Sequence, residues 1–223
     1  MEEQKHDIKK LTFKEYYKPF LEEINISENT KLNKALERAW INRDFEIDKY
    51  WSRATYFWAF IAASFAGYIS VISSDAISQP FKNELAFILI CMGTVFTSAW
   101  FLVNIGSKKW QENWEKHIDM LEDKVTGPLY KTVFNSRGYS VSKINTLTSG
   151  FIIFIWVILA FLQGLGFIMQ NQKCQTLATD WIIVGSALST IGFLMFMIWY
   201  CRDNSVSQKN GFSFSRRKKH YNG

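Results

Sequence analysis

The residues that could act as nucleophiles, acids, bases or metal ligands are scattered along this chain. Its three histidines and three cysteines are isolated from one another and lack the spacing of a zinc site or a disulfide framework. The sequence has no Gly-rich phosphate loop, no H-E-x-x-H and no nucleophile elbow. His117, with Asp119 and Glu115 beside it, is most simply a histidine on a helix surface. We therefore expect no enzyme, no metal site and no cofactor.

The most informative feature is a set of four long stretches without Asp, Glu, Lys, Arg or His. Each has the roughly 20 residues that a helix needs to cross a hydrocarbon core of about 30 Å. We expect an all-α membrane protein with four transmembrane helices in two hairpins. The absence of carboxylates from these stretches argues against a proton-coupled transporter or pump. The predicted spans are 54–74, 85–105, 149–169 and 181–201.

Gln163 is the most polar side chain deep in a predicted span. An amide in lipid seeks a partner, and a hydrogen bond to another helix is worth about 0.6 to 2 kcal/mol. Packing is the commoner role for such a residue. The alternative is pore lining, since one Gln per subunit would form a polar ring in a symmetric oligomer.

Small residues recur at four-residue spacing within three of the predicted spans. They let helix backbones approach closely, and packing drives helix association in lipid. These lines could pack within one subunit or face neighbouring subunits, and both alternatives stay open. The residues are Ala59, Ala63 and Gly67 in the first span, Ala160 and Gly164 in the third, and Gly185 and Ser189 in the fourth.

Basic residues divide the connecting segments into two classes. The loops at 75–84 and 170–180 hold one basic residue each, whereas segments 1–53, 106–148 and 202–223 hold eleven, seven and six. Because cytoplasmic segments carry the excess of Lys and Arg, we expect both chain ends in the cytoplasm. The net charge of +6 has the same explanation. The first fifty residues contain no apolar stretch typical of a signal peptide, so the first span should act as the insertion signal.

The chain thus divides into five predicted parts: a helical N-terminal segment (1–53), a first hairpin (54–105), a helical cytoplasmic segment (106–148), a second hairpin (149–201) and a basic tail (202–223). Apolar residues around 32–40 follow helical spacing, and no Gly or Pro interrupts the chain from Lys31 to Ala66. One long helix can therefore run into the first span. The tail has no apolar period and should lack regular structure.

An apolar stripe follows the second span and includes Trp110, Trp114 and Leu121. Such a stripe is most often packed core, here against the helix around Leu36, although it could also recruit a protein partner. Gly127, followed by a proline, should end this helix.

Two basic clusters should contact anionic lipid, at about 1 kcal/mol per residue. We do not expect nucleic acid as a partner, because four charges in a tail are few for that role. The clusters are Lys108 with Lys109, and Arg216, Arg217, Lys218 and Lys219.

Two sequence segments carry a resemblance to a known family. These are YWSRATYFWAF at 50–60 and GSKKWQENWEKHID at 106–119, the latter followed by LE at 121–122 and GPLY at 127–130. They resemble the RipA-like group of octameric bacterial inner-membrane proteins over about residues 40–135. The second hairpin has no counterpart that we can place.

The resemblance implies a ring-shaped homo-oligomer, of eight subunits in that group, in the bacterial inner membrane. One member class is similar in design to the pore-forming accessory membrane protein of type VI-B CRISPR systems, which acts in phage defence. The R-x(4–6)-H signature of that protein is not found here, which argues against an RNase. We expect a pore- or channel-forming assembly in stress or defence; the alternative is a non-conducting scaffold whose cytoplasmic helices recruit a partner.

Overall fold

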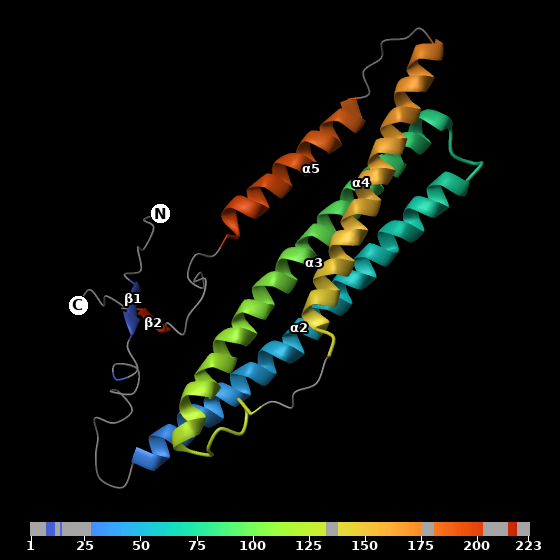
Figure 1. The fold of residues 1–223 in the computed structure, drawn as a ribbon. Helices are drawn as coiled ribbons and strands as arrows, with labels where there is room; N and C mark the ends of the chain where they lie inside the picture. Colours follow the sequence, from blue (N-terminus) through green and yellow to red (C-terminus); the bar gives the residue numbers. More distant parts are fainter. Residues whose placement is uncertain are drawn as a thin grey trace. The chain divides into compact units, whose positions relative to one another are not determined.

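The computed structural model describes residues 8–11, 14, 28–132, 138–174, 181–202 and 214–217. Its elements follow the order β1, α2, α3, η1, α4, α5 and β2 (Figure 1). The four long helices α2 to α5 are each long and apolar enough to cross a membrane. The predicted fold class, a helical protein with four transmembrane helices, is confirmed.

Helices α2 (Glu28–Ser73) and α3 (Gln79–Leu121) are much longer than a membrane requires. They contain 46 and 43 residues, so α2 alone is about 69 Å long, roughly twice the thickness of the hydrocarbon core. The prediction that one helix runs without a break into the first span is confirmed, and α3 likewise continues past the second. Helix α3 ends at Leu121, before the predicted Gly-Pro stop, and a short 3₁₀ turn, η1 (Glu122–Lys124), follows it.

Helices α4 (Val141–Cys174) and α5 (Trp181–Tyr200) form the second pair. Helix α4 has 34 residues and begins eight positions before the apolar stretch expected to start at 149. Its first two turns mix polar and apolar residues, so helical structure starts before the continuous apolar region. Helix α5 has 20 residues and is apolar almost throughout, in agreement with the predicted span.

The chain divides into two compact units, each built from segments that are distant in sequence. One unit comprises Glu46–Lys109 and Ser136–Asp203 and contains all four predicted spans, so we call it the spanning unit. The other comprises Met1–Phe45, Trp110–Asn135 and Asn204–Gly223, and we call it the extramembrane unit.

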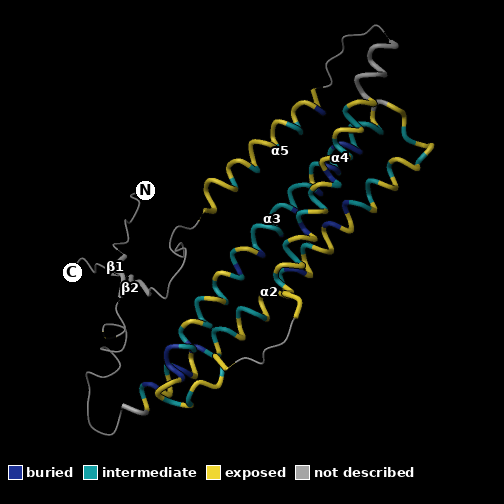
Figure 2. The backbone as a smooth tube through the Cα atoms, viewed as in Figure 1, coloured by how far each residue is buried: buried dark blue, intermediate teal, exposed yellow. Residues whose placement is uncertain are grey.

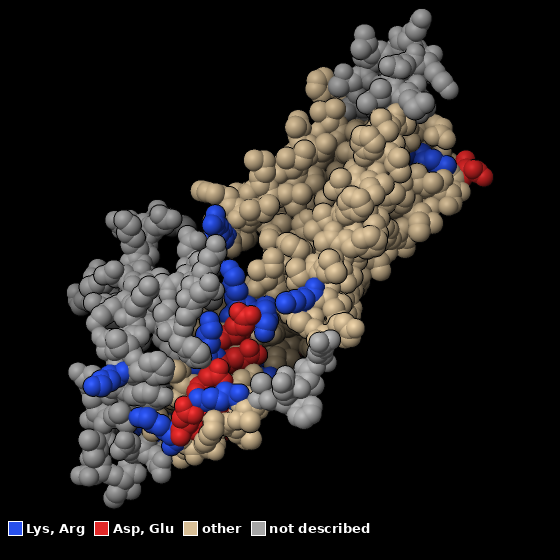
Figure 3. Space-filling view, in the orientation of Figure 1, with Lys and Arg blue, Asp and Glu red and all other residues tan. Residues whose placement is uncertain are grey.

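Helix α3 is the central element of the spanning unit. In its most apolar 18-residue stretch, 39 % of the residues are buried. In the corresponding stretches of α2, α4 and α5, 11 % are buried. In Figure 2, α5 is drawn mostly as exposed, and of its described residues only Ile183 is fully buried. On the face drawn in Figure 3, the body of the spanning unit shows only uncharged residues between its ends. An exposed, uncharged, apolar surface of this kind suits lipid.

Two short strands pair within the extramembrane unit. Strand β1 (Ile8–Leu11) runs antiparallel to β2 (Phe214–Arg217), with Ile8 opposite Arg217 and Leu11 opposite Phe214. We expected no regular structure in the basic tail, and β2 is a local departure from that expectation. The pairing joins segments near the two ends of the sequence, and local periodicity gives no signal for such a distant contact.

Candidate functional site: interhelical contacts and exposed faces

The best-packed point of the spanning unit is an indole ring held by three helices. The ring of Trp156 on α4 stacks on Phe65 of α2, with ring centroids 4.0 Å apart and planes 18° from parallel. Its Nε1 donates a hydrogen bond of 3.1 Å to Thr97 Oγ1 on α3. A Cβ at Gly93 would overlap this indole, so only glycine leaves room for it. Sequence reasoning missed this contact.

Helix α3 also carries a column of buried polar side chains. Thr97, Trp100, Asn104 and Ser107 recur at spacings of three and four residues, and each is at most 3 % exposed. Ser107 Oγ accepts a hydrogen bond of 2.7 Å from Arg53 of α2. Trp100 Nε1 and Asn104 Nδ2 have no hydrogen-bond partner within the structure. A polar stripe in a helix otherwise suited to lipid must face protein, which is why α3 occupies the centre.

Polar contacts also join α2 to its neighbours just before the first predicted span. Asn145 Nδ2 donates a hydrogen bond of 2.6 Å to the Tyr50 hydroxyl, which ties α4 to α2. Arg53 lies 3.8 Å from Glu46 in addition to its bond with Ser107. Tyr50 and Arg53 belong to the segment on which the family resemblance rests.

Gln163 forms an interhelical hydrogen bond. Its Nε2 donates to Asn83 Oδ1 of α3 over 3.1 Å, and its side chain is half-buried. A hydrogen bond between two helices is the contact expected if Gln163 serves helix packing. The amide is therefore already partnered inside one subunit.

Most of the small-residue lines are not filled within the subunit. Gly67 is the exception, since a Cβ there would lie 3.2 Å from Leu89 Cδ2 on α3. Ala59 and Ala63, on the same helix, are exposed. On α4, Ala160 and Gly164 are half-buried, and no atom lies within 4 Å of a Cβ added at Gly164.

The small residues on α5 are also left open within the subunit. The Cys91 thiol of α3 donates to the Ser186 carbonyl oxygen over 3.8 Å. Gly185 and Ser189 are exposed, and a Cβ at Gly185 would meet nothing within 4 Å. Lines of small exposed residues on α2 and α5 are therefore open to lipid or to another helix.

The extramembrane unit has its own hydrophobic core. Leu32, Leu36 and Ala39 of α2 pack against the end of α3, where Ile118, Met120 and Leu121 are all buried. Trp40 and Tyr130 border this cluster. The expected contact between the stripe after the second span and the helix around Leu36 is thus formed by Leu121 and its neighbours, and not by the two tryptophans.

Trp110 and Trp114 lie outside that core and are half-buried. The ring of Trp114 lies 5.5 Å from that of His117, with the planes tilted by 36°. Burial lowers the pKa of His117 from 6.5 to about 4. His117 is therefore neutral at physiological pH.

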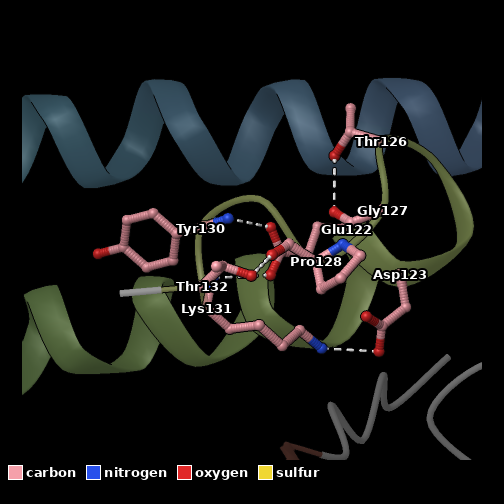
Figure 4. A network of polar contacts seen from close by, with 8 residues as sticks. All are labelled: Glu122, Asp123, Thr126, Gly127, Pro128, Tyr130, Lys131 and Thr132. Carbon is pink, nitrogen blue, oxygen red and sulfur yellow. Dashed lines mark hydrogen bonds and ion pairs between the residues drawn. The ribbon is translucent and has the colours of Figure 1, made fainter. Parts of the chain in front are cut away.

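A buried carboxylate organises the loop after α3 (Figure 4). Glu122 is 1 % exposed, and its two carboxylate oxygens accept hydrogen bonds of 2.6 and 3.0 Å from the backbone N–H groups of Tyr130 and Lys131. Its carbonyl oxygen also accepts the N–H of Gly127 over 2.8 Å. Gly127 has φ of 78°, which glycine adopts without strain. The glutamate and the glycine are parts of the LE and GPLY segments quoted above.

The same loop places Tyr130 in a cation–π cluster. Its ring meets that of Trp40 edge-on at 5.1 Å, and the guanidinium of Arg43 lies 5.4 Å from the Tyr130 ring and 5.5 Å from that of Trp40. Burial raises the pKa of the Tyr130 hydroxyl; the nearby Glu115 adds to this shift and Arg43 opposes it. Arg43 thus links α2 to the loop that Glu122 shapes.

The basic residues expected to contact lipid are only partly described. Lys109 is exposed and Lys108 is half-buried. Arg216 and Arg217 lie in β2, and Lys218 and Lys219 fall outside the described residues. Within the described segments, no group of three or more His, Cys, Asp or Glu side chains could hold a metal ion.

Four apolar helices, a polar column facing inward and unfilled small-residue faces define a polytopic membrane protein that offers packing surface to further helices. The sequence matches the octameric membrane protein family (8xMP) over residues 33–165, and the chain belongs to that family. The match extends beyond the resemblance at residues 40–135 to include most of α4, and it excludes α5. No curated protein and no solved structure matches the chain. The protein is therefore an oligomeric membrane protein.

Proposed function

We propose that copies of this chain assemble into a closed ring that forms a pore in the bacterial inner membrane and acts in stress or phage defence. The observation that carries this proposal is the exposed small-residue line of Ala59 and Ala63 on α2, in a member of an octameric family. Small exposed residues allow the close helix contacts that a ring of subunits requires. The stress or defence context is supported by the resemblance of residues 40–135 alone.

We place both chain ends in the cytoplasm. Two observations support this orientation: the basic residues concentrate in the three long segments, and β1 pairs with β2. Strands from the two ends of a chain can pair only if they lie on the same side of the membrane. Green fluorescent protein fused to the C-terminus should fluoresce, and an active alkaline phosphatase fusion at that position would contradict the orientation.

Conduction is tested with purified protein in dye-loaded liposomes, in which the wild-type protein should cause leakage. The pair Gln163 and Asn83 offers an internal control. Gln163→Leu and Asn83→Leu each break the same interhelical hydrogen bond, so a purely structural role changes both variants alike. If Gln163 also lines the pore, Gln163→Leu should change the leakage rate more than Asn83→Leu does. No leakage from an intact oligomer would contradict the pore.

A non-conducting scaffold is the second candidate, and a specific observation favours it. Trp110 and Trp114 lie outside the hydrophobic core, so the stripe is not fully used within the subunit. Aromatic side chains of this kind commonly anchor protein interfaces. Replacing both with Ala should abolish co-purification of a cytoplasmic partner while membrane insertion is retained.

A further inference from the structure

An open groove in the spanning unit has the form of a binding site for a single phospholipid. The groove has a volume of about 580 Å³ and runs along α4, with one wall formed by α3. Its residues recur at three- and four-residue spacing, so they share one face of α4. The lining includes Phe101 of α3 and Ser142, Lys143, Gly150, Phe151 and Phe154 of α4.

The two ends of the groove differ in chemistry. Ser142 and the exposed Lys143 lie at the start of α4, before the apolar stretch begins at 149. Apart from Thr146, the rest of the lining is apolar. Phe151 and Phe154 are 61 % and 58 % exposed. Phe101 Cε2 would lie 3.9 Å from a Cβ at Gly150, so this glycine keeps the middle of the groove open.

The groove reaches from the polar start of α4 into the apolar stretch. From Lys143 to Phe154 the helix rises about 17 Å, and the part from 149 onward rises about 8 Å, roughly half of one leaflet of a hydrocarbon core of about 30 Å. A cation above such an apolar wall complements an anionic headgroup and the first part of its acyl chain. Because α4 starts in the segment that we place in the cytoplasm, the lipid would come from the inner leaflet.

We propose that this groove binds one anionic phospholipid per subunit, with its phosphate at Ser142 and Lys143 and an acyl chain along Phe101, Gly150 and Phe154. The site requires only that α3 and α4 span the membrane. It does not depend on conduction or on the number of subunits.

The test is native mass spectrometry of the full-length protein with phosphatidylglycerol or phosphatidylcholine of identical acyl chains. The wild type should retain phosphatidylglycerol in preference to phosphatidylcholine. Lys143→Gln should lower phosphatidylglycerol retention about fivefold, the effect of one basic residue near anionic lipid. Lys116→Gln removes one exposed charge that lies outside the groove and outside the basic clusters expected to contact lipid, so it should leave retention unchanged. Equal losses in the two lysine variants, or no preference in the wild type, would overturn the proposal.

A second pair of variants tests the apolar part of the groove. Gly150→Leu should fill it and lower the retention of both lipids, whereas Gly164→Leu, on the same helix with no atom near its added Cβ, should not. Unchanged retention in Gly150→Leu would contradict the acyl-chain position. If Gly150→Leu cannot be recovered as a folded protein, the comparison of Lys143→Gln with Lys116→Gln decides.

Discussion

At the scale of single residues, the spanning unit depends on one glycine as much as on any large side chain. Gly93 makes room for the indole of Trp156, which three helices share. Close packing of this kind tolerates added volume poorly, because the surrounding helices must then move apart.

Gly93→Ala should therefore destabilise the protein by about 1–3 kcal/mol despite the better helix propensity of alanine. Gly106→Ala, on the same helix, is the matched control, because a Cβ there meets nothing within 4 Å. Thermal unfolding in detergent measures both. A Gly93→Ala protein as stable as Gly106→Ala would show that the indole does not occupy this position.

Glu122 should matter for the extramembrane unit through two backbone groups. Glu122→Ala leaves the N–H groups of Tyr130 and Lys131 without their acceptor, at an expected cost of about 1–3 kcal/mol. Asp123→Ala, the neighbouring control, breaks only the exposed ion pair with Lys131, which is worth about 1 kcal/mol at most. Proteolysis between 122 and 131 should accelerate only in Glu122→Ala; equal rates would contradict the bonding.

The lowered pKa of His117 predicts a dependence of stability on pH. Between pH 6.5 and about 4 the unfolded chain binds a proton that the folded chain does not, so stability falls as the pH falls through this window. The total loss is at most about 3.5 kcal/mol. Burial raises the pKa of Asp119, which acts in the opposite sense, so unfolding of the wild type and His117→Gln should be compared. Parallel pH profiles would exclude a buried neutral His117.

At the scale of elements, the sequence predicts where helices cross the membrane better than it predicts how they pack. The charge-free stretches and the absence of Gly and Pro from 31 to 66 predict the spans and the unbroken α2. The spans carry no charge on any side, so charge patterning does not show that Trp156 faces Gly93. The stripe of Thr97, Trp100 and Asn104 is the signal in the sequence that could have identified α3 as the central helix. In the sequence alone, nothing distinguishes Glu122 from an exposed acidic residue, because its burial depends on the loop that follows it. The two paired strands lie near opposite ends of the sequence, too far apart for any local pattern to predict their contact.

The exposed line on α2 gives the prediction that belongs to this scale. Ala63→Leu adds bulk to the line shared with Ala59 and should reduce the yield of intact oligomer several-fold, because close helix contacts between subunits need small side chains. Ala62→Leu makes the same change one position away, outside that line. Size-exclusion chromatography in detergent compares the two. If both variants keep the wild-type size, α2 does not pack against a neighbour through this line.

At the scale of the whole molecule, the single subunit leaves much of its apolar surface exposed, as one subunit of an assembly would. In the most apolar stretches of three of its four long helices, only 11 % of the residues are buried. Helix α5 contributes one fully buried residue among those described. Lipid can cover such surfaces, but family membership indicates that other copies cover part of them. The family match ends at residue 165, so α5 lies outside the matched region.

The most direct test of this account is the number of subunits in the detergent-extracted protein, measured by mass photometry and imaged by electron microscopy. We predict a closed ring with a central opening, with eight copies as the family description states. Such a ring would direct attention to the residues that line the opening. A monomer or a compact dimer would contradict the ring and leave a membrane-anchored interaction protein as the better description.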